Sequence, residues 1–216
     1  MEQTLTDSGW RGSPDVWLNA AYETLLDSGV DAVRIQTLSK KLNLARTSFY
    51  RSFEDREELL AALLARWREK NTGSILKQAN AYADSLVEAI LNVSDCWFNN
   101  EIFDSKFEFA IRSWAMQSPE ILAEVHAADR ARIRAIAEMF MRFGESEFAA
   151  DVRARNIYLL QIGYISMQMS EDIALRMKRM PEYLKGFTGK PPKQKDLDRF
   201  FARHGITPEQ MEAAHD

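Results

Sequence analysis

Apolar residues recur every three or four positions along most of the chain, which is the period of a helix with one buried face. The first clear stripe runs from Trp17 to Leu26. Ser13 and Pro14 precede it as a suitable helix cap and first turn, and Gly29 follows it as a helix-ending glycine. The chain has no Asn-Gly or Asp-Gly dipeptide and no sustained apolar alternation of period two. The pattern therefore predicts an all-α protein.

Short helices are expected after this first one, at residues 35–42 and 46–53, with the turn Asn43-Leu44-Ala45 between them. Another begins near residue 56, where Asp55 and Glu58 are spaced as a capping pair. Beyond residues 71–73 the pattern changes and the helices become longer. Four helices are predicted: one at 74–93, one that contains Phe107 and Trp114, one at 119–143 and one at 148–177. Pro181 and the tract 186–192 are expected to end the compact region, leaving two short helices (193–204 and 208–214) as a tail.

The composition is that of an ordinary soluble globular protein, with 46% hydrophobic and 28% charged residues in 216. Cys96 is alone, which excludes an internal disulfide and a Cys-rich zinc site and fits a reducing compartment. The longest uncharged stretch, residues 156–170, is too short to span a membrane, and residues 1–13 lack the apolar segment of a signal peptide. A cytoplasmic location is expected.

The region 35–53 has the pattern of a helix-turn-helix unit. Leu38, Leu42, Leu44 and Phe49 are placed to pack its two helices against the first helix, which leaves the opposite face free to enter a major groove. The side chains expected on that face carry guanidinium and hydroxyl groups, which bind phosphates and base edges. They are Arg46, Thr47, Ser48, Tyr50, Arg51 and Ser52.

Residues 17–60 resemble the amino-terminal domain of the tetracycline-repressor (TetR) family of bacterial transcriptional regulators. The core of the resemblance is the stretch LSKKLNLARTSFYRSFEDREELL at 38–60. Tyr50, Phe53, Glu57 and Leu59 match the family pattern, and Ser48 supplies its usual hydroxyl. A length of about 200 residues with one amino-terminal DNA-binding unit also fits.

Four positions depart from the family pattern. Asn43 replaces the turn glycine, although Asn tolerates a positive φ angle better than most residues. Ala45 replaces the Ser or Thr that caps the recognition helix, and Val33 stands where many members have a phosphate-contacting Thr. Arg56 replaces a Lys, and its charge at the start of a helix still suits a phosphate.

The resemblance implies DNA contacts from eight residues: Lys40, Lys41, Arg46, Thr47, Ser48, Tyr50, Arg51 and Arg56. Ser48, Tyr50 and Arg56 are expected on phosphates, while Arg46, Thr47 and Arg51 are better suited to base or mixed contacts. Phe49 and Phe53 are expected in the core. Tyr50 is open to a half-buried core role, and Lys41 to a merely solvated one.

Residues 156–180 are apolar almost all around the predicted helix, so more than one face needs cover. A second copy of the chain is one source of that cover, and the interior of a larger monomer is the alternative. The resemblance implies a homodimer in which the last two long helices of each subunit pack against those of the other. It also implies a small-molecule pocket enclosed by the helices. The pocket candidates are Trp97, Phe107, Arg112, Trp114, Tyr158, Gln161 and Tyr164, although aromatic residues at helical spacing are more often plain core, and the polar ones are also open to a surface role. An apolar or aromatic effector is the default for such a pocket.

Enzyme chemistry has no support in the sequence. His126, His204 and His215 are far apart and have no paired metal ligands, and Cys96 has no identifiable His partner. Motifs for nucleotide or dinucleotide binding and for a serine nucleophile are missing as well. We therefore expect no enzyme activity, no metal and no cofactor.

The prediction is a ligand-responsive regulator, a repressor that binds a palindromic double-stranded DNA operator as a homodimer and is released by a small effector. The alternative is a helical small-molecule or protein-binding module whose helix-turn-helix no longer binds DNA, which the changes at Val33 and Ala45 favour. The expected domains are a DNA-binding unit at 11–56, an effector-binding and dimerisation domain at 57–185, and a helical tail at 186–216. The net charge of −4 argues at first against a DNA partner. However, residues 34–56 carry +4 and the other 193 residues carry −8. Because affinity for phosphate depends on the local charge, this distribution is compatible with DNA binding.

Overall fold

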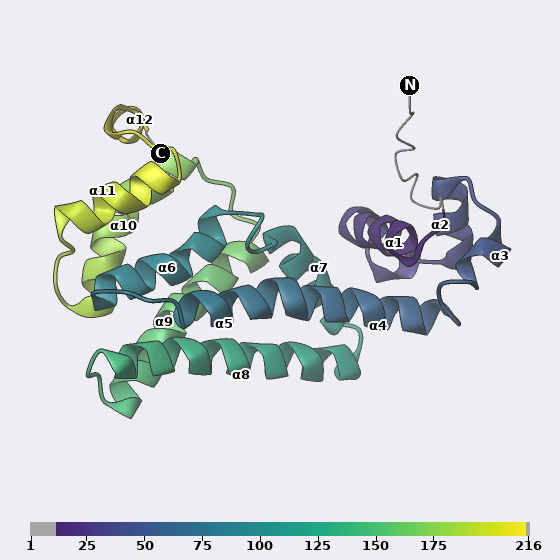
Figure 1. Cartoon of the computed structure of the whole chain (residues 1–216), viewed down its shortest axis with the longest axis horizontal. Coiled ribbons are helices and arrows are strands. Elements are labelled where there is room, and N and C mark those ends of the chain that lie inside the picture. Colours follow the sequence, from purple (N-terminus) through teal and green to yellow (C-terminus); the bar gives the residue numbers. More distant parts are fainter. Residues whose placement is uncertain (1–11, 215–216) are drawn as a thin grey trace, which may run out of the picture.

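The computed structural model describes residues 12–214, and every regular element in that range is helical (Figure 1). The predicted all-α class is confirmed. The predicted domain start at residue 11, the last two residues of the predicted tail, and His215 lie outside the described residues.

The amino-terminal unit consists of α1 (Pro14–Ser28), the 3₁₀ turn η1 (Val30–Ala32), α2 (Ile35–Leu42) and α3 (Arg46–Phe49). They gather at one end of the molecule (Figure 1). Trp17, Leu38 and Phe49 are fully buried between them, and the Trp17 and Phe49 rings meet edge to face with their centroids 5.3 Å apart. This apolar wedge sets the angle between α1 and the helix-turn-helix.

A single continuous helical path leads from this unit into the rest of the molecule (Figure 1). It joins α4 (Arg56–Trp67), a π-helical turn η2 (Arg68–Thr72) and α5 (Gly73–Ala79). The predicted break at 71–73 is wrong, because Gly73 keeps helical angles of φ −55° and ψ −41°. The helix ends only at Asn80, so the predicted helix 74–93 is divided there. Its second part is α6 (Leu86–Phe98), which begins where Ser85 accepts a hydrogen bond from the Glu88 amide.

The remaining body contains α7 (Ser105–Ala115), α8 (Pro119–Arg142), α9 (Glu147–Ser166) and α10 (Ile173–Thr188). The predicted helix 148–177 is wrong in its length, because the chain turns between α9 and α10. Gln168 adopts a positive φ of 51°, and the Met169 amide donates back to the Tyr164 carbonyl. Asp172 then caps α10 by accepting from two backbone amides.

The carboxy-terminal segment packs as part of the body, contrary to the prediction that Pro181 and residues 186–192 end the compact region. Pro181 lies inside α10. The following α11 (Gln194–Arg203) buries Leu197, Phe200 and Phe201 in the same core as α6, and α12 (Pro208–Ala213) packs against α10.

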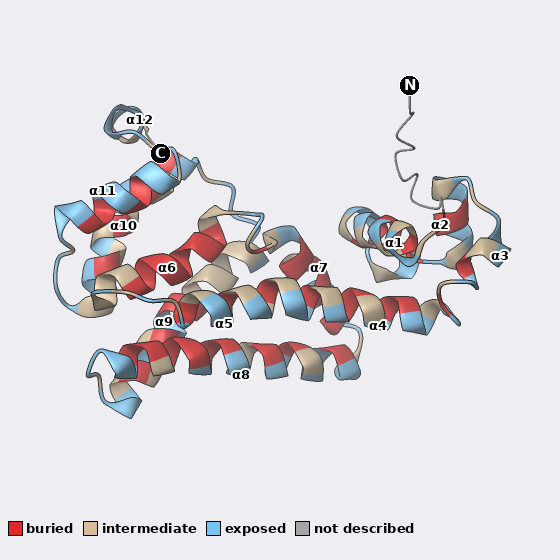
Figure 2. Cartoon of the chain, viewed as in Figure 1, coloured by how far each residue is buried: buried red, intermediate tan, exposed pale blue. Residues whose placement is uncertain are grey.

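Two clusters of buried side chains hold the molecule together. One joins α1–α4 to α7 and the first half of α8, and the other joins α5, α6, the second half of α8, and α9–α11. Figure 2 shows buried positions along the length of α8. The first cluster continues across residues 56–57, so the amino-terminal unit shares its core with the helices beyond it.

Candidate nucleic-acid interface and effector cavity

The face formed by α2, α3 and the turn after α3 is open to solvent. Its exposed side chains include most of the predicted DNA-contacting residues: Lys40, Lys41, Arg46, Thr47, Tyr50 and Arg51. Ser48 and Arg56 are partly buried, while Phe49 and Phe53 lie in the core as expected. The Tyr50 side chain is 59% exposed and meets the Phe49 ring edge to face, so the half-buried alternative does not describe it.

The turn of the helix-turn-helix is made by Asn43, which takes the left-handed conformation with φ 52° and ψ 46°. Its amide donates to the Lys40 carbonyl, and the next amide, of Leu44, donates to the Ser39 carbonyl. Ala45 at the start of α3 supplies no side-chain cap, as the sequence predicts. Regular α3 is only four residues long, shorter than the predicted 46–53, although bonds from the Ser52 and Phe53 amides to the Phe49 carbonyl continue the turn.

Among the predicted DNA contacts, Lys41 and Arg56 have partners on neighbouring elements of the chain. Lys41 Nζ lies 2.9 Å from Glu23 Oε2 on α1. Arg56 donates from Nε to the Val33 carbonyl at 2.6 Å and from Nη2 to the Val30 carbonyl at 2.9 Å. Arg56 therefore ties the η1 turn to the start of α4, a structural role that its sequence position alone did not reveal.

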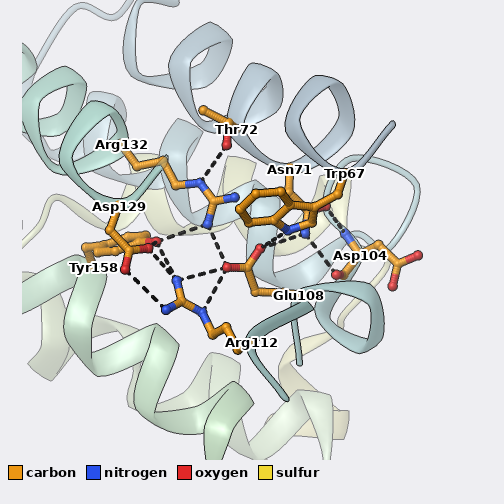
Figure 3. A network of polar contacts seen from close by, with 9 residues as sticks. All are labelled: Trp67, Asn71, Thr72, Asp104, Glu108, Arg112, Asp129, Arg132 and Tyr158. Carbon is orange, nitrogen blue, oxygen red and sulfur yellow. Dashed lines mark hydrogen bonds and ion pairs between the residues drawn. The ribbon is translucent and has the colours of Figure 1, made fainter. Parts of the chain in front are cut away.

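A network of buried polar groups surrounds the π-helical turn η2 (Figure 3). At its centre, Glu108 of α7 and Arg132 of α8 are both fully buried, with Arg132 Nη1 donating to Glu108 Oε1 at 2.8 Å. The other Glu108 oxygen accepts from Trp67 Nε1 at 2.7 Å and from Asn71 Nδ2 at 2.9 Å. Arg132 Nε donates to Thr72 Oγ1 at 3.0 Å. Both charges thus bind the helix that leads to the DNA-binding unit.

The network extends to α9 through a second arginine. Arg112 donates to Glu108 Oε1 at 3.0 Å and pairs with Asp129. The Tyr158 hydroxyl accepts from Arg112 at 3.1 Å and from Arg132 at 3.0 Å, and it donates to Asp129 at 2.6 Å. Two carboxylates and two guanidiniums balance in charge, which makes their shared burial tolerable.

Burial and the neighbouring charges determine the protonation states of the groups in this network. Burial raises the pKa of the Glu108 carboxyl, but the adjacent Arg132 and Arg112 guanidiniums lower it by more, so the net shift is downward. Burial also raises the pKa of Tyr158. The network therefore holds an ionised carboxylate beside a protonated phenol.

Sequence reasoning singled out Arg112 and Tyr158 but missed Arg132, which contacts both Glu108 and Tyr158. The sequence did carry a signal for the burial of Arg132. This residue lies on the same helix face as the apolar positions Val125, Ala128 and Ile136 of α8, which are buried. An unpaired arginine on such a face is costly, so a buried carboxylate partner was to be expected.

A cavity of about 650 Å³ lies where α1 meets the ends of α6, α9 and α10 and the start of α7. Of the predicted pocket residues, Trp97, Gln161 and Tyr164 line it. The other four lie elsewhere. Phe107 is a core residue against Tyr22, Trp114 packs on the same core, and Arg112 and Tyr158 belong to the network around Glu108.

Cys96 is buried beside Asp95, and burial raises the pKa of its thiol to about 12. His204, which sequence reasoning left without a partner, contacts Asp95 through Nε2 at 2.8 Å. Among residues 12–214, no three His, Cys, Asp or Glu side chains gather as a metal site would require. Nor does any helix in that range have the length and apolar character to cross a membrane.

Comparison with known proteins supports the helix-turn-helix assignment. Residues 18–63 match the model of the family described as bacterial regulatory proteins, tetR family. A comparison with curated proteins finds no match.

Solved structures share the fold over nearly the whole chain. A TetR-family transcriptional regulator from Mesorhizobium loti MAFF303099 is 14% identical with a TM-score of 0.56, covering 92% of this chain and 98% of that one. A TetR-family regulator from Rhodococcus sp. is 13% identical with a TM-score of 0.54, covering 87% and 97%. A transcriptional regulator from Rhodococcus sp. RHA1 is 15% identical with a TM-score of 0.52, covering 91% and 100%. Residues 18–63 thus match the tetR family of bacterial regulatory proteins, and the chain as a whole shares the fold of these solved structures.

Proposed function

We propose that the protein is a transcriptional repressor that binds double-stranded operator DNA as a homodimer and changes its DNA affinity when a small molecule occupies the cavity. The observation that carries the proposal is the open face of α3, which presents Arg46, Thr47 and Tyr50 to solvent while Phe49 fixes the helix in the core. Guanidinium and hydroxyl groups on a helix of this size suit the major groove. Such a protein acts in the compartment that holds the DNA, here the cytoplasm.

The outer face of the α8–α9 hairpin supports a homodimer. On α9, Phe148, Val152 and Leu159 are exposed at helical spacing, with exposed fractions of 81%, 42% and 54%. Leu122 and Met141 are exposed on α8, and a shallow groove runs between the two helices. The ion pairs Arg134–Glu138 and Arg155–Asp151 line this groove, beside the exposed apolar residues. An apolar stripe with a charged border is the usual composition of a subunit interface.

This dimer face includes only part of the segment 156–180. Ile157, Tyr158, Met177 and Met180 of that segment are buried within their own chain. The subunit itself therefore covers those residues, whereas Leu159, Met167, Met169 and Ile173 of the same segment stay exposed.

Effector control follows from where the cavity lies. Leu26 and Asp27, at the end of α1, line it together with residues of α9 and α10. A molecule bound there contacts the DNA-binding unit directly, so its binding energy can favour one placement of α1–α3 over another. Repression needs no further surface, since a dimer seated on an operator blocks access to that DNA.

One observation favours the alternative, a binding module without DNA affinity. The recognition helix lacks a side-chain cap and has only four regular residues. Loss of one cap costs about 1 kcal/mol, which is small beside the burial of Trp17, Leu38 and Phe49 that holds the unit together. We therefore favour the DNA-binding function.

Selection of bound duplexes from a random DNA pool, followed by gel-shift titration, tests the proposal. We expect an inverted repeat with half-sites about one helical turn apart. The double substitution Arg46→Ala and Tyr50→Ala is expected to abolish selection, whereas Lys77→Ala on the exposed side of α5 serves as the charge-matched control. Failure of the wild-type protein to enrich any sequence would favour the alternative.

A further inference from the structure

We infer that the cavity takes a small carboxylic acid with an aromatic or branched apolar body, and that Arg176 receives its carboxylate. The inference rests on the proposed function only for its regulatory meaning, since binding itself is independent of DNA. A volume of about 650 Å³ suits a small molecule. Trp97, Phe98, Phe109 and Ile165 supply the apolar wall.

Arg176 is the cation best placed to bind an anion in this cavity. Its guanidinium carbon lies 4.8 Å from the centre of the Phe98 ring and 5.0 Å from that of Tyr164. Its one hydrogen bond in residues 12–214 runs from Nη2 to Gln161 Oε1 at 3.2 Å, and no carboxylate of that range pairs with it. A guanidinium has five N–H donors, so most of its donor capacity is left for a ligand. Burial lowers the pKa of Arg176, which an anionic ligand would reverse.

The other charged residues of the cavity wall do not form an ion pair with Arg176. Glu171 is committed to Arg179, with 2.6 Å between its Oε1 and Arg179 Nη1. Asp27 and Lys106 are exposed at the mouth. Arg176 therefore contacts two aromatic rings and forms no ion pair within residues 12–214, and the charge of Glu171 only partly offsets the effect of burial on the pKa of Arg176.

Two buried polar atoms in the wall also lack partners. Trp97 is only 8% exposed, and its indole Nε1–H has no acceptor. Glu171 Oε2 is buried and has no donor. Buried polar groups are normally hydrogen-bonded, because leaving one unpaired is costly. A hydroxyl group on the ligand that reaches either atom would give it the partner that it lacks, so hydroxylated acids are the members of the class to compare with the plain acids.

Calorimetric titration of the full-length protein with matched acid and amide pairs tests this inference. The pairs are benzoate and benzamide, phenylacetate and its amide, 4-hydroxyphenylacetate and its amide, and isovalerate and its amide. At least one acid is expected to bind about tenfold or more tightly than its amide, with the hydroxylated acid ahead of the plain one. The contrary result, in which no acid exceeds its amide, would overturn the inference.

Variants tie the preference to the named atoms. Arg176→Gln is expected to remove the preference for the acid while leaving amide affinity unchanged, and Lys178→Gln, an exposed change two positions along α10, is expected to keep it. Trp97→Phe, which keeps an aromatic wall but lacks the N–H, is expected to weaken the best acid about fivefold. Circular dichroism confirms that each variant is folded. An undiminished acid preference in Arg176→Gln would contradict the inference.

DNA binding is measured in parallel, so that the two proposals fail separately. Acid binding without any DNA binding would leave the inference standing and remove the repressor function. Selective DNA binding without acid binding would do the opposite.

Discussion

At the scale of single residues, the most demanding feature is the full burial of Glu108 and Arg132. Each charge is tolerable only while the other is present, and each also holds a group on the helix that leads to the DNA-binding unit, Trp67 and Asn71 in one case and Thr72 in the other. The network therefore links three long helices to the π-helical turn. Changes here are expected to act on stability and on DNA binding together.

Glu108→Gln is expected to lower the free energy of unfolding by about 3 kcal/mol, because it leaves the buried Arg132 and Arg112 guanidiniums with one carboxylate between them. Urea unfolding followed by circular dichroism measures this. Glu138→Gln, which removes the exposed partner of Arg134, is the control and is expected to change stability far less than Glu108→Gln does. Equal effects of the two substitutions would contradict the assigned burial.

The same carboxyl predicts a pH dependence. The pKa of Glu108 is lowered in the folded protein, whereas an unfolded Glu titrates near about 4.3. Its contribution to stability is therefore complete above that pH and is lost as the pH falls through the lower folded value. Thermal unfolding between about pH 6 and pH 3 is expected to show a steeper fall in Tm for the wild type than for Glu108→Gln. Parallel curves would show that Glu108 does not carry this dependence.

At the scale of elements, the structure shows which turn and helix-end signals in the sequence were informative. The helix-turn-helix was predictable because its stripes and its Asn43 turn are local signals. Gly73 was misleading, since the contacts of Asn71 and Thr72 with α7 and α8 hold the helix together through it. The turn at Gln168 was missed, because glutamine carries no local signal for a positive φ. The buried role of Arg132 and the tie made by Arg56 also depend on residues distant in sequence.

Asn43 is expected to limit the stability of the helix-turn-helix. Asn43→Val places a β-branched residue at φ 52° and is expected to lower the free energy of unfolding by about 1–2 kcal/mol. Asn43→Gly, which adopts that angle without strain, is expected to cause no loss. Thermal unfolding compares the three proteins. A Val variant as stable as the wild type would refute the importance of this turn.

At the scale of the whole molecule, the two ends have different tasks. The end with α1–α3 carries exposed cations, which we propose bind DNA, while the α8–α9 face carries exposed apolar residues, which we propose meet a second copy. The shared core between α1–α4 and α7–α8 connects them, and the cavity lies against two of these helices, α1 and α7. The acidic balance outside residues 34–56 leaves the attraction for phosphate on the α2–α3 face.

The double substitution Phe148→Arg and Leu159→Arg is expected to convert a dimer into a monomer, because it places charges in the centre of the proposed interface. Light scattering coupled to size-exclusion chromatography measures the mass. Tyr82→Arg, at an equally exposed aromatic residue between α5 and α6, is the control and is expected to leave the dimer intact. A wild-type protein that elutes as a monomer at all concentrations would rule out this interface.

We propose that the α2–α3 face binds DNA through its cations. The salt dependence of operator affinity tests this claim most directly. For the wild type, the logarithm of the binding constant is expected to fall linearly with the logarithm of salt concentration. Arg46→Ala and Lys40→Ala are each expected to bind more weakly, and a phosphate contact at either position makes the slope shallower by about one. Lys77→Ala is expected to leave affinity and slope unchanged. Wild-type affinity and slope in both of the first two variants would contradict the claim.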